Sequence, residues 1–427
     1  MTRIRRLGEI TEVIIRGAAP RYVESGGVAV LNQKCIRNQR VSYEDARRTD
    51  AESRPIRADR WLRQFDILVN STGVGTLGRV GQVITIPEPT TVDSHVTIVR
   101  PAPSEVHPHF LGFALRSMQG EIESLATGST GQTELSRDHL RELTLALPPL
   151  PEQRAIAEVL GALDDKIEAN ERMNATLDEM ARALFKSWFV DFDPVRAKAE
   201  GRQPSHMDAA TAARFPASFE DSALGPIPAG WRVGEVGDIV QSARNSVQPS
   251  EVEPGTAYVG LDHIPRRSLA LADWGDVGSV TSGKVRFRKG DILFGRLRPY
   301  FTKVVVAPLD GICSSDIVVC RPTQSSYLAA AATQLADTAF IDYCDAASTG
   351  TRMPRVSWED MSRYPMALPA DAILEEFNAL VEPWLSLMCV NTHESRTLAE
   401  LRDTLLPRLI SGEVRVKAPV CILGRDC

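Results

Sequence analysis

The feature that most constrains the fold is an internal repeat, because the two halves of the chain carry the same short motifs in the same order about 221 residues apart. The matched pairs are Leu7–Ile10 with Val236–Ile239, Asp66–Leu68 with Asp291–Leu293, Val99–Pro101 with Cys320–Pro322, Ser129–Gly131 with Ser348–Gly350, Leu143–Pro148 with Tyr364–Pro369, Asn170 with Asn391, Leu177 with Leu398, and Leu184 with Leu405. The offset drifts slightly along the chain, which indicates loop insertions between common elements. A repeat of this length predicts two similar domains.

The first part of each half alternates short apolar runs with Gly- and Pro-rich turns. The runs with β character are Val83–Ile86, Val96–Val99, Lys303–Val306 and Ile317–Val319. Short helical segments such as Phe110–Leu115 lie between them. This pattern predicts an α/β (α+β) domain with a modest sheet.

The second part of each half carries an apolar seam that repeats every three or four residues. In the first half the seam is Ile156, Leu160, Leu163, Ile167, Leu177, Leu184 and Trp188, with Asn170 and Asn174 in register. In the second half it is Ile373, Phe377, Leu380, Trp384, Met388, Leu398, Leu405 and Leu409, with Asn391, Ser395 and Arg402 in register. A mean spacing of 3.5 residues is typical of coiled coils, so we expect the two helices to pair with each other as an antiparallel pair.

Two further features shape the expected helices. The first seam, at ~1.5 Å per residue, spans about 50 Å. Pro383 falls inside the second helix and should kink it or mark a second start.

These patterns divide the chain into six segments. We expect a first globular domain over 1–150, a central helix over 151–190, a connector over 191–225, a second globular domain over 226–370, a distal helix over 371–412 and a tail over 413–427.

The charge distribution permits binding to nucleic acid although the net charge is −6. Residues 1–63 hold 14 Lys or Arg against 8 Asp or Glu, and residues 281–303 hold 7 against 1. Residues 151–193 are instead acidic, with 5 basic and 10 acidic side chains. Attraction to phosphate depends on charge within about 10 Å, so both basic stretches are candidates for contact with DNA.

Motifs for catalysis and for metal binding are missing from the sequence. There is no GxxxxGK[ST] phosphate loop, and Gly73–Gly78 fits GxGxxG without the acidic residue of a dinucleotide fold. His107-Pro108-His109 offers too few metal ligands, and Asp164-Asp165 is expected to be a solvated helix face. The seven cysteines form no CxxC pair. With no apolar run of membrane length and no signal peptide, we expect a cytoplasmic protein with no membrane partner.

Four longer motifs resemble the specificity subunits of type I restriction-modification systems. They are Leu147–Ile156 and Trp188–Lys198 at the ends of the central helix, Leu224–Trp231 before the second globular domain, and Leu405–Val414 in the distal helix. The resemblance covers nearly the whole chain. The second helix departs from the family pattern, because Ala370–Phe377 lacks the Pro-Glu-Gln sequence that opens the first.

The resemblance implies a DNA-reading subunit with no catalytic site. Each globular domain would be a target-recognition domain for one half of a bipartite site in double-stranded DNA, and the helices would set a spacing of roughly 15 base pairs. The implied partners are two methyltransferase subunits and two restriction/translocase subunits. S-adenosylmethionine, ATP and Mg would be bound by those partners, with no cofactor in this chain. A coiled-coil scaffold that binds proteins without recognising DNA is the alternative.

Candidate DNA-binding residues are polar or basic side chains on turns between the predicted elements, because base edges are read by such side chains. They are Arg63, Ser71, Thr72, Arg79, Thr130 and Gln132 in the first domain, and Lys289, Arg296, Arg298, Tyr300, Lys303, Thr351 and Arg352 in the second.

Overall fold

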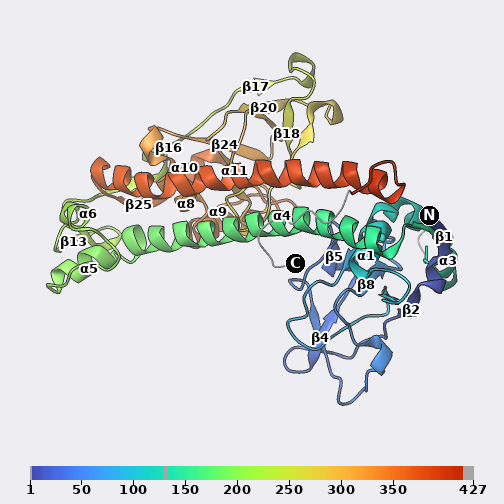
Figure 1. Cartoon of the computed structure of the whole chain (residues 1–427). Helices are drawn as coiled ribbons and strands as arrows, with labels where there is room; N and C mark the ends of the chain where they lie inside the picture. Colours follow the sequence, from blue (N-terminus) through green and yellow to red (C-terminus); the bar gives the residue numbers. More distant parts are fainter. Residues whose placement is uncertain (1, 128–132, 417–427) are drawn as a thin grey trace. The chain divides into compact units, whose positions relative to one another are not determined.

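The computed structural model describes residues 2–127 and 133–416, which fold into two compact units. Unit 1 combines Met1–Asp165 with Leu398–Cys427, and unit 2 is Lys166–Thr397. Each unit therefore holds one globular domain together with segments of two long helices, α4 (Leu150–Phe185) and α11 (Asp371–Ile410) (Figure 1).

The globular part of unit 1 is a mixed α/β domain. Its strands are β1 (Arg3–Arg6), β2 (Thr11–Arg16), β3 (Tyr22–Val23), β4 (Val28–Leu31), β5 (Ile36–Arg37), β6 (Arg40–Val41), β7 (Arg47–Thr49), β8 (Ile67–Asn70), β9 (Val80–Gln82), β10 (Thr90–Val92), β11 (Val96–Pro101) and β12 (Thr144–Leu147). Its α-helices are α1 (Pro108–Ser117), α2 (Gln119–Ser124) and α3 (Arg137–Glu142). The strands form a six-stranded sheet in the order β2-β11-β8-β9-β6-β5, a four-stranded sheet β10-β4-β7-β3 and the pair β1-β12.

Unit 2 repeats this plan after a helical connection. Its strands are β13 (Phe219–Ser222), β14 (Gly225–Pro228), β15 (Arg232–Glu235), β16 (Val240–Ser242), β17 (Ser246–Val247), β18 (Ala257–Val259), β19 (Gly275–Asp276), β20 (Lys284–Phe287), β21 (Ile292–Gly295), β22 (Val304–Val306), β23 (Gly311–Cys313), β24 (Ile317–Pro322) and β25 (Pro365–Leu368). Its shorter α-helices are α5 (Asp193–Ala199), α6 (Ala209–Arg214), α7 (Val236–Ile239), α8 (Leu328–Leu335), α9 (Thr338–Ala346) and α10 (Trp358–Ser362). The main sheets are β16-β24-β21-β22 and β17-β20-β23-β18-β19.

The sequence repeat is also a repeat of strand register. Leu68 of β8 faces Ile98 of β11, as Leu293 of β21 faces Val319 of β24. The parallel pairing of β4 with β10 has its counterpart in β18 with β23. The single modest sheet expected in each half is thus two sheets, because the shorter strands are only two to four residues long and carry little sequence signal.

The central strands are buried on both faces, which explains their continuous apolar runs. In β8, Ile67 and Val69 join the core cluster beneath α1 and α4, whereas Leu68 joins a separate cluster with Leu31 of β4. The same alternation recurs in β21, where Ile292 packs with the helices and Leu293 with the second sheet.

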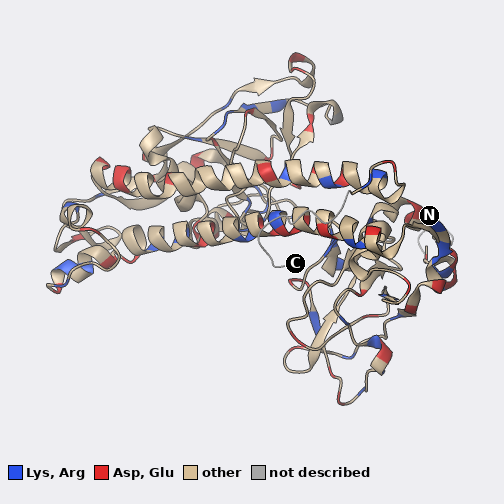
Figure 2. Ribbon diagram, viewed as in Figure 1, with Lys and Arg blue, Asp and Glu red and all other residues tan. Residues whose placement is uncertain are grey.

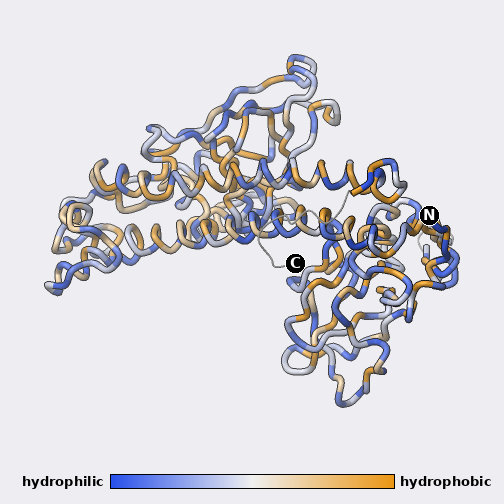
Figure 3. The backbone as a smooth tube through the Cα atoms, viewed as in Figure 1, coloured by the Kyte–Doolittle hydropathy of each residue, from blue (hydrophilic) through white to orange (hydrophobic). Residues whose placement is uncertain are grey.

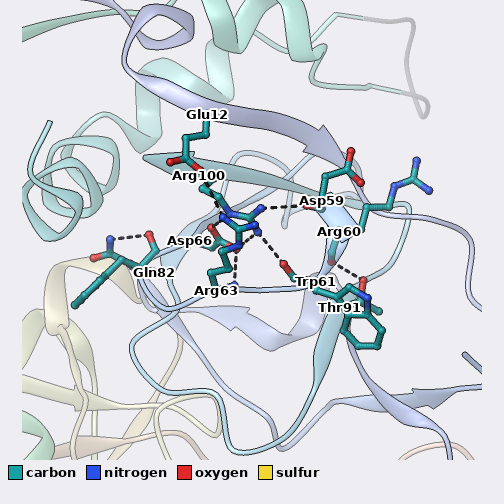
Figure 4. A network of polar contacts seen from close by, with 10 residues as sticks. Glu12, Asp59, Arg60, Trp61, Arg63, Asp66, Gln82, Thr91 and Arg100 are labelled. Carbon is teal, nitrogen blue, oxygen red and sulfur yellow. Dashed lines mark hydrogen bonds and ion pairs between the residues drawn. The ribbon is translucent and has the colours of Figure 1, made fainter. Parts of the chain in front are cut away.

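An ion pair joins the two central strands in each unit, and it is buried in unit 1 and half-buried in unit 2. In unit 1, Arg100 donates two hydrogen bonds to the Asp66 carboxylate, at 2.8 and 2.7 Å, and one to the Trp61 carbonyl (Figure 4). In unit 2, Arg321 donates to Asp291 at 2.7 and 2.6 Å. Burial raises the pKa of the Asp66 carboxyl, although the bonds from Arg100 oppose this effect.

The helices pair with each other in both units, as the seams predicted. In unit 2, the Asn170 amide donates to Glu394 and Ser395, and the Asn391 amide donates to the Asn174 side chain at 2.9 Å. Because higher numbers on α4 meet lower numbers on α11, the helices run antiparallel. Apolar and hydrophilic residues are interspersed along both helices in Figure 3, as expected for helices that bury one stripe.

Three details of the helix seams differ from the sequence predictions. Leu380 is 44% exposed, and Val381 is the residue buried in its place. The α11 helix continues through Pro383 without a second start. Asp164, expected on a solvated face, accepts hydrogen bonds from Arg116 at 2.8 Å and Arg402 at 2.7 Å within unit 1.

Candidate nucleic-acid interface

In each unit a loop leaves the end of a buried central strand. The loop covers residues 71–79 between β8 and β9, and residues 296–303 between β21 and β22. Both strand pairs are antiparallel, so each loop is the tip of a hairpin, and we call these two segments the hairpin loops. Loops held by a rigid sheet are common positions for binding residues. The GxGxxG match of Gly73–Gly78 lies in such a loop and is followed by a strand rather than by the helix of a dinucleotide site.

A second segment lies against the hairpin loop of each unit. In unit 2, Leu297 forms a β-bridge with Arg355, and the Arg298 amide donates to the Pro354 carbonyl at 2.9 Å. In unit 1, Thr72 forms the matching bridge with Glu134. Turns that lie far apart in the sequence therefore form one surface in each domain. Thr130 and Gln132 lie outside the described residues.

Four of the predicted side chains come together on the unit 2 surface. Arg298, Tyr300, Thr351 and Arg352 are all exposed, and Arg298 donates from its guanidinium to the Arg352 carbonyl at 3.3 Å. The Tyr300 ring is 4.5 Å from that of Phe301. This surface presents two guanidinium groups, a phenol and a hydroxyl, a set suited to phosphates and base edges.

Arg298 and Thr302 occupy backbone conformations that favour glycine. Their φ angles are +53° and +50°. The corresponding positions of the unit 1 hairpin loop are Gly73 and Gly78, with φ of +107° and +79°. Keeping an arginine where the repeat has a glycine is unfavourable by about 1 kcal/mol, which points to a function for its side chain.

The unit 1 hairpin loop is less basic. The Thr72 hydroxyl lies 2.7 Å from Nδ1 of His95, and half-buried Arg79 donates to the Gly75 carbonyl. Ser71 is fully buried, with its hydroxyl 2.6 Å from that of Thr97. Ser71 thus holds the loop to β11 and is not open to a ligand.

The remaining candidates contribute no exposed side chain to the hairpin-loop surfaces. Arg63 and Lys289 are exposed but precede β8 and β21, so they are at the opposite ends of those strands. Lys303 donates its ammonium to the Leu261 carbonyl, and burial together with nearby Arg266 lowers its pKa. Arg296, the first residue of the unit 2 hairpin loop, is half-buried. The structure therefore favours Arg298, Tyr300, Thr351 and Arg352 over the other basic candidates of unit 2.

Two arginines beside the unit 2 surface were not among the residues predicted from the sequence. Arg266 lies over the Phe301 ring at 4.0 Å, and Arg355 pairs with Asp316 at 2.7 Å. Both lie outside the basic stretch 281–303, so a count of local charge could not find them. Only the fold brings them beside the hairpin loop.

Within the described part of the chain, no His, Cys, Asp or Glu side chains form a group of three able to hold a metal ion. The cysteines described there are free thiols. None of the described helices has an apolar stretch long enough to cross a membrane.

Comparisons with known proteins point to one family. A model of the type I restriction modification DNA specificity domain matches residues 3–179. The specificity subunit of the type I restriction enzyme HindI from Haemophilus influenzae is 25% identical over 483 residues, covering 96% of this chain and 98% of that subunit. This chain is similar to the type I specificity subunits over nearly its whole length. The specificity subunit of MjaIX from Methanocaldococcus jannaschii is also 25% identical, and the alignment covers 79% of this chain and 76% of that subunit.

A solved specificity subunit shares the fold. The crystal structure of the type I restriction-modification S subunit from M. genitalium aligns over 96% of both chains with a TM-score of 0.54 and 15% identity. The predicted resemblance and the fold class, two mixed α/β domains with long linking helices, are thereby confirmed. The relatives are specificity subunits, which are non-catalytic targeting subunits of type I restriction enzymes, and their family needs no cofactor of its own.

Proposed function

We propose that this chain is the DNA sequence-specificity subunit of a type I restriction-modification complex, and that each globular domain reads one half of a bipartite target. Residues 1–150 and 226–370 would be the two target-recognition domains. The complex would act in the cytoplasm on double-stranded DNA. The comparisons give no support to the alternative of a scaffold that does not recognise DNA.

One observation carries this proposal: the two domains share a fold and a buried framework, but their hairpin loops carry different side chains. The buried pair of Asp66 with Arg100 recurs as Asp291 with Arg321. In the hairpin loops, by contrast, Gly73 of unit 1 corresponds to Arg298 of unit 2. A constant frame with different exposed side chains is expected of two readers of different base sequences.

The helices supply surface for partner subunits. Met173 and Met180 on α4 are 46% and 45% exposed, and Leu380 and Leu387 on α11 are 44% and 39% exposed. Each pair is spaced by one heptad, so each helix exposes an apolar stripe that a partner helix can cover. We propose that two methyltransferase subunits dock on the helices and that two restriction/translocase subunits complete the complex. S-adenosylmethionine, ATP and Mg would be bound by those partners.

The helices would also set the distance between the half-sites. The 36 residues of α4 correspond to about 54 Å, or roughly 16 base pairs of duplex. Charged residues of both signs are distributed along α4 and α11 (Figure 2), in contrast to the basic stretches near the recognition surfaces.

Mapping methylated bases in DNA from cells with and without this gene tests the proposal. With the partner subunits present, we expect a split motif with unread bases between two specified blocks, and its loss when the gene is deleted. An unchanged methylation map would contradict the proposal, as would DNA or ATP hydrolysis by the isolated chain.

A further inference from the structure

A tight turn lies beside the hairpin loop of unit 1. Asn38 and Gln39 join β5 to β6, with φ angles of +51° and +60°. The parallel pairing of Arg40 with Gln82 sets this turn at the start of β9, the strand into which the hairpin loop leads. The turn precedes β6 and Arg79 precedes β9, and these two strands are parallel. The turn and Arg79 therefore lie at the same end of the two strands.

Unit 2 carries the equivalent turn at the equivalent place. Ala29 of β4 and Ala257 of β18 occupy matched positions in the parallel ladders. Gln39 and Arg267 follow these alanines at the same distance along the chain, and Arg267 also has a positive φ, of +53°. The repeat thus keeps the positive φ at the second position of the turn, while the two side chains change from Asn-Gln to Arg-Arg.

Direct contacts attach the unit 2 turn to its hairpin loop. The Arg267 amide donates to the Thr302 carbonyl at 2.9 Å. The neighbouring guanidinium of Arg266 lies 4.0 Å above the Phe301 ring, next to exposed Tyr300. The turn therefore extends the surface formed by Arg298 and Arg352.

The side chains at both turns are available to a ligand. Asn38, Arg266 and Arg267 are exposed, and Gln39 is half-exposed. The side-chain amides of Asn38 and Gln39 can donate and accept hydrogen bonds, and the Arg267 guanidinium can donate them.

We propose that these turns are a second base-reading element in each domain, in which Asn38 and Gln39 read adenine and Arg267 reads guanine, with Arg266 held by Phe301 as support. Asparagine and glutamine match the N6/N7 edge of adenine, and arginine matches the O6/N7 edge of guanine. The two half-sites then differ in composition at the positions that these turns reach. This inference rests on the proposed function.

The test is single-molecule methylation sequencing of DNA exposed to the complete complex, with methyltransferase subunits, carrying wild-type or variant chain. Asn38→Gly with Gln39→Gly, and separately Arg267→Gly, remove the side chains while glycine keeps the positive φ. We expect at least tenfold weaker discrimination at an adenine of one half-site in the first variant, and at a guanine of the other half-site in the second. His206→Gly is the matched control, since His206 is an exposed residue with a φ of +56° in the connection between α5 and α6, outside both globular domains in sequence.

The outcomes separate this inference from the proposed function. A wild-type complex that yields no split motif contradicts the proposed function itself. A wild-type split motif that is unchanged in both turn variants overturns the inference alone, and so does uniformly weaker methylation with unaltered base preference, which indicates phosphate contacts. Asn38→Asp and Arg267→Lys change the hydrogen-bonding groups with a smaller change in side-chain volume than the glycine variants. They should also weaken discrimination between bases in the methylated sequence, so a folding defect in the glycine variants would not decide the result.

Discussion

Arg298 gives the sharpest test at the scale of single residues. Its positive φ predicts that Arg298→Gly relieves backbone strain and leaves the free energy of unfolding equal or raised by up to about 1 kcal/mol. The same change removes a guanidinium and should weaken binding of the complex to its target by about tenfold. Thr302→Gly, in the same loop, should match the stability effect without the binding effect. Loss of stability without loss of binding would show that Arg298 is only structural.

Asp164 tests the buried charges of unit 1. Burial would raise the pKa of its carboxyl, but Arg116 and Arg402 outweigh this effect and lower it. Asp164→Asn removes the carboxylate paired with buried Arg116 and one of the two carboxylates paired with buried Arg402, so we expect a loss of about 3 kcal/mol in the free energy of unfolding at neutral pH.

The pH dependence of this loss follows from the sign of the shift. A lowered pKa means that the stabilisation by Asp164 is complete above its ordinary pKa of 3.8 and disappears as the pH falls below it. The difference between wild type and Asp164→Asn in denaturant titrations should therefore shrink below about pH 4. The exposed neighbour Asp165, changed to Asn, should have little effect at any pH.

These residues also show where sequence reasoning ends. Asp66 and Arg100 could be recognised as repeated motifs, because both recur in order in the second half. The role of Asp164 could not be predicted, since neither Arg116 nor Arg402 is near it in sequence. The turn at Asn38 carries no repeated letters in unit 2, so only its backbone conformation identifies it.

Among the elements, α11 is unusual in continuing through a proline. Pro383 cannot donate the hydrogen bond that its position in the helix calls for. We expect Pro383→Ala to raise the free energy of unfolding by about 2 kcal/mol, measured by thermal or urea unfolding. Pro151→Ala in the first turn of α4, where proline is tolerated, should change it by less than about 0.5 kcal/mol. Equal effects of the two substitutions would contradict this account of α11.

The long helices were the most predictable elements, because a 3.5-residue period over more than thirty residues outweighs local noise. The choice between Leu380 and Val381 as the buried residue was not predictable, since adjacent apolar side chains fit the period almost equally well. The small second sheet of each domain was missed for a different reason: strands of two to four residues are defined by their partners rather than by their own pattern.

At the scale of the whole molecule, duplication explains why one chain can carry two readers. Each half supplies one globular domain, which we propose is a recognition domain, and one long helix, and the hairpin loops can change without altering the frame of Asp66 and Arg100 or of Asp291 and Arg321. On this account, substitutions in one hairpin loop should alter only one half of the target.

Lengthening both helices by one heptad is the most direct measurement of the central claim, that two recognition domains read half-sites at a spacing set by α4 and α11. Repeating residues 166–172 in α4 and the facing residues 393–399 in α11 adds about 10 Å, or roughly three base pairs. Methylation sequencing should then recover the same two half-sites with a spacer longer by one to three base pairs. An unchanged spacer, or a change in the bases read within either half-site, would contradict the account.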